Sequence, residues 1–330
     1  AEDTKYSLNF NKESLDKIAD EAKAKFEAKT LTAAEVDSYL ASVKEIAEGI
    51  KDAVKNAEQE VYSFQVNTCY QNAAMHKSEC LGQVPENVQN YYAPAFEELD
   101  ADMMQVYMPF MMDSHIESAE QAKKMCDQFD AISKKADALL AASKKASTLV
   151  EDITATLASL DAEIAKIKKD FPEYDLSAVN ESAEYWKNLA AEFAQAPADP
   201  TASYTESKID GFVESFGYFK VNISDLYAQA QKDEWMAQFN AKYYPASQEM
   251  DGLISQLNTE CPTVKDKYFT KLDDLNVEMT QMYMKLYQDE LTQEQFDAML
   301  ARIDAILAEG QKIVAEAKEA EKVATGISGI

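Results

Sequence analysis

The chain has 330 residues, 46% of them apolar, and its 59 acidic side chains against 32 basic ones leave a net charge of −27. This charge excludes nucleic acid as a partner, because binding to phosphates depends on Lys and Arg, and it disfavours anionic membrane surfaces. No run of about 20 apolar residues is present, so we predict no membrane insertion. The chain has only eight Gly and eight Pro, which favours long helices over turn-rich sheets.

The first two helices are predicted from an apolar pattern and a capping signal. The first spans about Lys12 to Glu27. Thr32 and Glu35 have the spacing of a capping box, in which the Thr oxygen accepts from the backbone and the Glu side chain reaches back. The second helix therefore begins after Thr32 and continues to at least Phe64.

Prolines and a second capping pair mark the next two helices. Pro85 is favoured in a first helical turn and predicts the start of the third helix, while Pro94 either kinks that helix or marks its true start. The fourth helix begins after Ser118, with Gln121 completing a capping box, and it reaches about Lys169, since its apolar stripe continues to Ile167. A helix of ~50 residues would be ~75 Å long, which is typical of a coiled coil.

The second half starts with a short helix and an aromatic one. A fifth helix runs from about Ser177 to Ala196. The sixth is rich in aromatic side chains and begins at the capping pair Ser203 and Glu206. Because proline removes a helical hydrogen bond, Pro245 is predicted to interrupt the sixth helix.

The last two helices also begin at recognisable residues. Pro262 opens the seventh helix, since proline suits a first helical turn. Thr292 caps the eighth helix together with Gln295, in the same spacing that Thr32 and Glu35 show near the start of the chain. The same way of starting a helix therefore recurs at both ends of the chain.

An apolar stripe on the third helix recurs 176 residues later on the seventh. Its steps of three and four residues place it on one helix face. Its positions are Val88, Tyr92, Phe96, Leu99, Met103, Val106 and Phe110 in the first half, and Val264, Tyr268, Leu272, Leu275, Met279, Met282 and Leu286 in the second. The repeat predicts an all-α fold made of two tandem, related antiparallel bundles, at residues 1–172 and 173–330. Each bundle is expected to contain about four long, coiled-coil-like helices.

Four cysteines, Cys69, Cys80, Cys126 and Cys261, bear on the compartment. Cys69 and Cys80 flank a segment that could turn between two helices, and they form the candidate disulfide; the alternative is four unlinked thiols in a reducing compartment. The chain begins at Ala1, which fits a secreted protein after removal of a signal peptide and also fits trimming of Met. We expect an extracytoplasmic location, either secreted or periplasmic.

The sequence contains no catalytic or cofactor-binding motif. His76 and His115 are the only histidines, and neither lies in a recognised zinc, di-iron or catalytic spacing. We therefore predict no enzyme, no catalytic residues and no cofactor. Four neighbouring carboxylates, Glu97, Glu98, Asp100 and Asp102, are the metal candidates, as calcium ligands or as a solvated acidic face. Diffuse, low-affinity calcium binding by the whole acidic surface is expected.

The densest apolar run closes the third helix, where Pro109 should kink or end it. Methionines and aromatics at a helix end can form an adaptable docking surface for a protein partner, or they can close the core of a bundle. The partner-docking candidates are Tyr107, Met108, Phe110, Met111 and Met112.

These features predict a non-enzymatic extracytoplasmic protein that acts as a helical scaffold, a self-assembling subunit or a partner-binding module. In gross composition the chain resembles the acidic, lysine-rich coiled-coil proteins of ciliate secretory granules such as trichocysts, without a shared motif. That resemblance implies the first alternative, a calcium-responsive secretory matrix or storage protein. A second alternative is a helical receptor for an apolar ligand, with the aromatic sixth helix lining a cavity.

Overall fold

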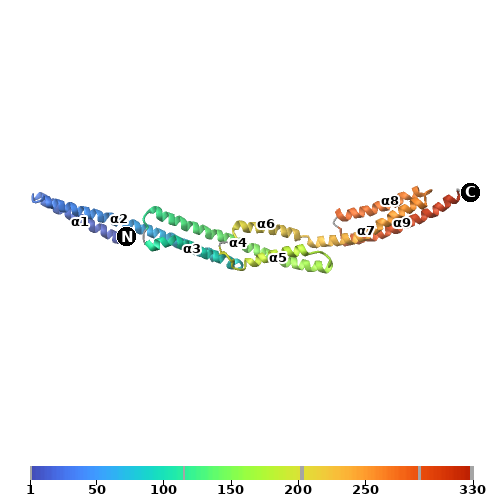
Figure 1. The fold of residues 1–330 in the computed structure, drawn as a ribbon, viewed down its shortest axis with the longest axis horizontal. Helices are drawn as coiled ribbons and strands as arrows, with labels where there is room; N and C mark the ends of the chain where they lie inside the picture. The colour runs from blue at the N-terminus through green and yellow to red at the C-terminus, as the bar shows by residue number, and fades with distance from the viewer. Residues whose placement is uncertain (1, 114–115, 201–203, 289–290, 328–330) are drawn as a thin grey trace. The chain divides into compact units, whose positions relative to one another are not determined.

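The computed structural model describes residues 2–113, 116–200, 204–288 and 291–327, and each regular element within them is a helix (Figure 1). The helices are α1 (Glu2–Glu27), α2 (Ala33–Leu81), the 3₁₀ helix η1 (Glu86–Val88), α3 (Gln89–Asp113), α4 (Ala119–Asp170), α5 (Ser177–Glu192), α6 (Glu206–Ile223), α7 (Leu226–Glu260), α8 (Lys265–Gln288) and α9 (Gln293–Ile327). The all-α prediction is confirmed for these residues. None of the described helices has the length and apolar character needed to cross a membrane.

The chain divides into two compact units. Unit 1 comprises Ala1–Leu157 and Glu181–Phe219, and unit 2 comprises Ala158–Asn180 and Lys220–Ile330. Helices α4, α5 and α6 each contribute residues to both units. The predicted boundary at residue 172 lies inside Ala158–Asn180, the first of the two segments of unit 2.

Both predicted capping boxes at the chain ends are present. The Glu35 amide donates to the Thr32 hydroxyl at 3.3 Å, and the Thr32 amide donates to the Glu35 carboxylate at 2.9 Å. Lys25, together with Thr32, holds the pKa of Glu35 at about 2. Thr292 and Gln295 exchange the same two bonds, at 3.2 and 2.9 Å. Local hydrogen bonding therefore determines where α2 and α9 begin.

The predicted sixth helix is wrong in its extent. Helix α6 ends at Ile223 and α7 begins at Leu226, while Pro245 lies inside α7 rather than interrupting it. Packing accounts for this, because Ala246 is buried directly after the proline and the core continues through Met250. The proposed cap Ser203 lies outside the described residues; the described hydroxyl at the start of α6 belongs to Thr205, which accepts from the Lys208 amide at 3.4 Å.

Prolines do not end α3 either. Pro94 and Pro109 both lie inside the helix, which continues to Asp113. The other long prediction is confirmed, since α4 runs from Ala119 to Asp170. Ser118 accepts from the Gln121 amide at 3.2 Å, although the Gln121 side chain accepts from the backbone of Glu117 and not from Ser118.

In unit 1, α2 and α4 run parallel, with α3 returning between them. Two side-chain pairs join α2 to α4, Cys69 with Cys126 and His76 with Asp137, and Gln83, just after the end of α2, continues the order by pairing with Lys144. Their sequence separations stay between 57 and 61 residues. On α3, Asp100 pairs with Lys77 and Tyr107 with Asn67, so α3 runs antiparallel to α2.

In unit 2, α7 and α9 are related in the same way, and α8 contacts both. The side-chain pairs that join them are Lys242 with Asp304, Glu249 with Gln311, and Gln256 with Lys318, each 62 residues apart. Both units therefore contain two parallel long helices connected by a shorter returning helix.

The repeated apolar stripe lies in the core of each unit. The buried members are Val88, Tyr92, Phe96, Leu99 and Met103 on η1 and α3, and Tyr268, Leu272, Leu275, Met279 and Leu286 on α8. The stripe on α8 packs with residues of α7 and α9 in one cluster that includes Phe239, Met250, Phe296 and Ile303. The 3.6-residue period therefore identified the core faces of the two returning helices.

Two glycines of unit 2 are expected to respond in opposite directions to substitution. A Cβ on Gly310 would lie 3.0 Å from Leu253 Cδ1 and 3.3 Å from Met250 Cε, whereas a Cβ on Gly252 would meet nothing within 4 Å. Gly310→Val should therefore lower the free energy of unfolding by about 2 kcal/mol through overpacking. Gly252→Ala should raise it by up to about 1 kcal/mol through helix propensity. Chemical denaturation of both variants tests the pair, and a Gly310→Val variant as stable as the original chain would contradict the expected close packing.

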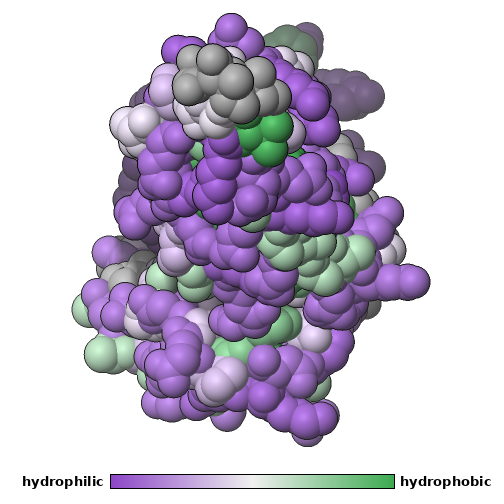
Figure 2. Space-filling model, turned by 90° about the vertical axis from the view of Figure 1, so that its right-hand side faces the viewer, coloured by the Kyte–Doolittle hydropathy of each residue, from purple (hydrophilic) through white to green (hydrophobic). Residues whose placement is uncertain are grey.

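The surface agrees with the high charge. The face drawn in Figure 2 is mostly hydrophilic, with small separate apolar areas. A hydrophilic face of this kind agrees with a chain in which 28% of the residues are charged.

Candidate functional site

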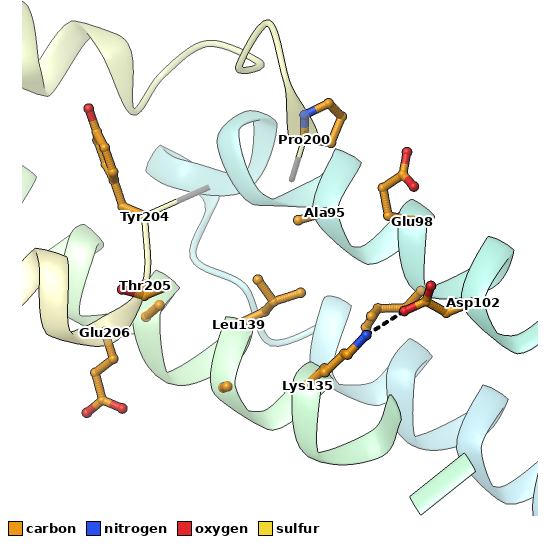
Figure 3. Close-up of a pocket in the computed structure, with 12 residues that line it drawn as sticks. Ala95, Glu98, Asp102, Lys135, Leu139, Pro200, Tyr204, Thr205 and Glu206 are labelled. Carbon is orange, nitrogen blue, oxygen red and sulfur yellow. Dashed lines mark hydrogen bonds and ion pairs between the residues drawn. The ribbon is translucent and has the colours of Figure 1, made fainter. Parts of the chain in front are cut away.

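A pocket of about 450 Å³ opens in unit 1 between α3, α4 and the start of α6 (Figure 3). Lys135 of α4 and Asp102 of α3 pair at 2.7 Å at one end, and Tyr204 and Glu206 stand at the other. The apolar part of the lining consists of Ala95, Leu99, Ala138, Leu139 and Ala142. The pocket is thus lined mainly by apolar surface and bordered by charges of both signs.

The aromatic residues of the predicted sixth helix do not line this pocket. Phe216 and Phe219 pack on Trp186, with ring centroids 4.9 and 6.3 Å away. Tyr204, which does line it, stacks on Tyr91 at 5.6 Å. Phe216 and Phe219 are buried in unit 1 and Phe239 in unit 2, so these aromatic side chains mainly build the two cores.

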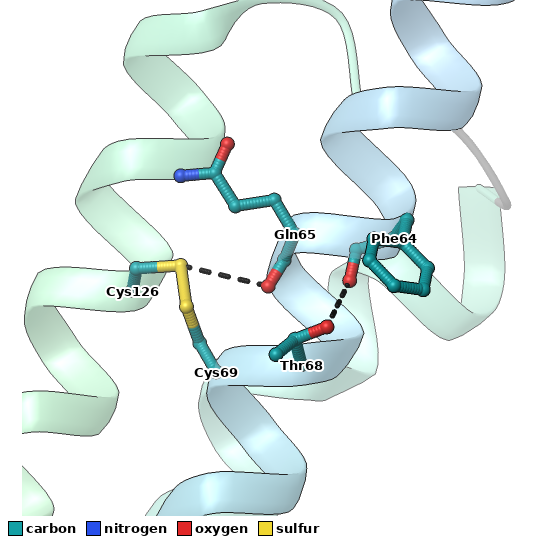
Figure 4. The surroundings of a disulfide bond; sticks show 5 residues. All are labelled: Phe64, Gln65, Thr68, Cys69 and Cys126. Carbon is teal, nitrogen blue, oxygen red and sulfur yellow. Dashed lines mark hydrogen bonds between the residues drawn. A yellow bond between two sulfur atoms is a disulfide. The ribbon is translucent and has the colours of Figure 1, made fainter.

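The disulfide joins Cys69 of α2 to Cys126 of α4, with Cα atoms 5.4 Å apart (Figure 4). The predicted pairing of Cys69 with Cys80 is wrong. Both residues lie on the continuous helix α2, where eleven residues correspond to about 16 Å, far beyond the reach of a disulfide. Cys80 and Cys261 are buried free thiols.

Cys80 lies in a cluster with His76 and Asp137. His76 Nε2 is 2.8 Å from Asp137 Oδ1, and Cys80 Sγ is 3.7 Å from each of these atoms. His76 is 40% exposed and Asp137 59%, while Cys80 is buried. One nitrogen, one sulfur and one oxygen therefore converge at the edge of the seam between α2 and α4.

The cluster does not have the geometry of a nucleophilic triad. In such a triad the acid binds one ring nitrogen of the histidine and the nucleophile binds the other. Here the thiol and the carboxylate both approach Nε2. Burial and the neighbouring Asp137 also raise the pKa of Cys80, which disfavours the thiolate that a nucleophile requires.

Sequence reasoning missed this cluster, although one half of it was visible. His76 and Cys80 are four residues apart and so share a face of α2. The third member, Asp137, comes from another helix, and its place depends on the pairing of α2 with α4.

No family model, curated protein or solved structure matches this chain. Function must therefore be argued from the geometry.

The N-terminal hairpin of α1 and α2 is a second candidate site. The two helices lie side by side (Figure 1), yet between residues 5 and 64, all of them described, Ala53 is the one buried residue. The shielded positions of α2 follow a heptad pattern and face α1; they are Glu35, Tyr39, Ser42, Ile46, Gly49 and Ala53. The hairpin is thus a two-helix coiled coil with a thin seam.

Helix α2 carries a second heptad stripe directly beside that seam. Its members, called the α2 stripe below, are Val36, Leu40, Val43, Ala47, Ile50, Val54, Ala57, Val61 and Phe64. The steps alternate between four and three residues throughout, and each position is apolar. Leu40 is 55% exposed, Val61 62% and Phe64 74%. A continuous apolar stripe of this length, open to solvent, is typical of a helix that packs against another helix.

The acidic candidates on α3 make different contacts from those of a calcium site. Asp100 pairs with Lys77 at 2.8 Å, and Asp102 pairs with Lys135. Glu97 and Glu98 are exposed on the same helix. A helix presents its carboxylates outward and does not wrap them around one ion, so this set corresponds to a solvated, lysine-paired face.

The predicted docking residues at the end of α3 divide into two groups. Tyr107 stacks on Tyr70 at 4.4 Å and donates to Asn67 Oδ1 at 3.1 Å, and Phe110 packs beside Tyr107 at 5.3 Å. These contacts belong to the packing of unit 1. The methionines are exposed: Met108 by 44%, Met111 by 56% and Met112 by 78%. Docking through these methionines stays a prediction.

Proposed function

We propose that this chain is a non-enzymatic, extracytoplasmic helical scaffold that self-assembles through the α2 stripe. The observation that carries the proposal is the uninterrupted apolar heptad from Val36 to Phe64, of which every member is exposed except Ile50 and Ala57, which are half-buried. Twenty-eight residues of helix extend about 42 Å, or four heptads, which is long enough for a specific coiled-coil contact. Two hairpins that pack their stripes together would form a four-helix bundle.

The charge distribution favours a second copy of the chain as the occupant. Residues 5–64 contain nine lysines and twelve acidic side chains, a balance of only −3 in a chain whose net charge is −27. Two copies would repel each other less over the hairpin than over an average stretch of this length, which would carry a charge of about −5. The apolar stripe therefore lies in a part of the chain where repulsion between copies is below average.

The Cys69–Cys126 disulfide supports the extracytoplasmic location. Structural disulfides persist in oxidising compartments and are rare in the cytosol. The absence of a nucleophilic geometry at the histidine cluster, which contains the one described histidine, supports a role without catalysis. Scaffolding by long helices requires neither a cofactor nor a reactive side chain.

Sedimentation of the full chain across a range of micromolar concentrations tests the proposal. We expect reversible association that the double substitution Leu40→Lys and Val54→Lys abolishes. Each substitution removes roughly 1.5–3 kcal/mol of apolar burial, so the dissociation constant should rise at least about 100-fold. Ser38→Lys with Asn56→Lys is the matched control, because it adds the same charge at exposed positions of α2 outside the stripe.

Other outcomes distinguish the alternatives. A chain that stays monomeric at every concentration would overturn self-assembly. Association that appears only with millimolar calcium and ignores the stripe substitutions would favour the calcium-responsive matrix instead. A small apolar ligand carried through native mass spectrometry, and released by substitution of Leu139 in the pocket, would favour the receptor.

A further inference from the structure

The cluster of His76, Cys80 and Asp137 has the dimensions of a metal site. Its three separations, 2.8, 3.7 and 3.7 Å, join Nε2, Oδ1 and Sγ. The circle through these atoms has a radius of about 2.0 Å, close to the bonds of about 2.0–2.3 Å that Zn²⁺ forms with nitrogen, oxygen and sulfur. An ion placed near that centre, slightly displaced from the thiol, would reach all three atoms at once.

Little rearrangement is required. Around a tetrahedral zinc ion, sulfur lies about 3.5 Å from a neighbouring nitrogen or oxygen ligand, and nitrogen about 3.3 Å from oxygen. Both separations from Cys80 Sγ are already near that value. The distance between His76 and Asp137 must open by about 0.5 Å, and both side chains are half exposed, so each is free to move by that amount.

Unit 2 provides an internal comparison. There Lys242 of α7 pairs with Asp304 of α9, as His76 of α2 pairs with Asp137 of α4. A buried residue follows four positions after the first member of each pair: Ala246 after Lys242 in unit 2, and Cys80 after His76 in unit 1. An ion pair and a small core residue therefore suffice to join the long helices. The histidine and the thiol of unit 1 add two metal ligands that this packing does not require.

A metal ion bound by the cluster would join α2 to α4, the same two helices that the disulfide joins. Cys80 follows Cys69 by eleven residues on α2, and Asp137 follows Cys126 by eleven residues on α4. Eleven residues are three helical turns, so each helix presents both positions on one face, about 16 Å apart. A metal ion here would be a second bridge across the seam, three turns beyond the first.

The ligand types select the metal. A thiolate and an imidazole suit Zn²⁺, whereas calcium takes hard oxygen ligands. Three protein ligands leave one position for water, and the exposure of His76 and Asp137 leaves that side open. We propose that His76, Cys80 and Asp137 bind one Zn²⁺ ion that joins α2 to α4 in unit 1.

Cobalt substitution in the full, metal-stripped chain tests this site. One equivalent of Co²⁺ should produce a thiolate-to-cobalt charge-transfer band and the intense visible bands of four-coordinate cobalt, and Zn²⁺ should displace it. Diffuse binding to surface carboxylates gives neither signal, because it supplies no thiolate. A large excess of Ca²⁺ should leave the spectrum unchanged.

Matched variants assign the ligands. Cys80→Ser should remove the charge-transfer band, whereas Cys261→Ser removes the other buried free thiol and should leave the band unchanged. Asp137→Asn should weaken zinc binding at least about 10-fold, and Asp130→Asn, an exposed change on the same helix, should not. Circular dichroism checks that each variant keeps its helices.

The results that would overturn the site are equally definite. Wild-type protein that shows no charge-transfer band with excess Co²⁺ does not hold a thiolate-ligated metal. A band that survives Cys80→Ser and is lost in Cys261→Ser would place the metal elsewhere. The readout is independent of self-assembly, since the cluster lies beyond the α2 stripe and the stripe variants keep all three ligands.

Discussion

Replacing Cys69 and Cys126 together by serine is expected to lower the free energy of unfolding of unit 1 by about 4 kcal/mol. The disulfide joins residues 57 positions apart. A cross-link over a loop of that length restricts the unfolded chain by roughly 4 kcal/mol in the chain-entropy account. Because the bond also joins parallel helices that share no short connection, its loss should loosen the pairing of α2 with α4 on which the His76 cluster depends.

The two tryptophans allow this loss to be measured in the correct unit. Trp186 is buried in unit 1 and Trp235 in unit 2. Denaturation followed by fluorescence in a Trp235→Phe background reports unit 1, and in a Trp186→Phe background it reports unit 2. The double cysteine variant should shift the first transition and leave the second in place.

Reduction provides the control for the disulfide. Dithiothreitol should destabilise the original chain as much as the double substitution does, and it should have no further effect on the variant. Two results would contradict a structural disulfide at Cys69 and Cys126. One is an unfolding transition of the original chain that dithiothreitol does not shift, and the other is a double variant as stable as the original chain.

Local signals explain which elements could be predicted from the sequence. The starts of α2 and α9 depend on bonds between residues three apart, and the buried face of α3 depends on a period within one helix. The break between α6 and α7 was missed because no proline or glycine marks it. The Ser224 hydroxyl bonds to the Val221 carbonyl there, a turn signal that serine carries only weakly.

The candidate sites could be predicted less well, because they depend on how helices pair. The partner of Cys69 is 57 residues away, and a preference for a short loop led to Cys80 instead. Asp137 joins His76 only once α2 and α4 run parallel in one register. The α2 stripe was present in the sequence as a heptad, but its exposure became visible only when the structure showed that α1 covers the neighbouring face.

Replacing Glu321 by alanine is expected to destabilise unit 2 by about 3 kcal/mol. This carboxylate of α9 is 8% exposed and accepts from the amides of Thr263, at 3.0 Å, and Val264, at 3.1 Å, immediately before α8 begins. Hydrogen bonds to a charged acceptor contribute about 1.5–3 kcal/mol each, and favourable alignment with a helix N-terminus adds to them. No residue within α8 replaces this cap, so the returning helix of unit 2 depends on a distant side chain.

Glu321→Gln and Glu316→Ala complete the test. Glutamine keeps one acceptor oxygen without the charge, so it should lose roughly half as much stability as alanine. Glu316 is exposed on the same helix, and its removal should change stability by no more than about 0.5 kcal/mol. Trp235 fluorescence during denaturation measures all three. The contrary result is that Glu321→Ala and Glu316→Ala unfold at the same denaturant concentration. In that case the cap from α9 contributes nothing to the stability of unit 2, and the start of α8 is held by its own backbone and the core beneath it.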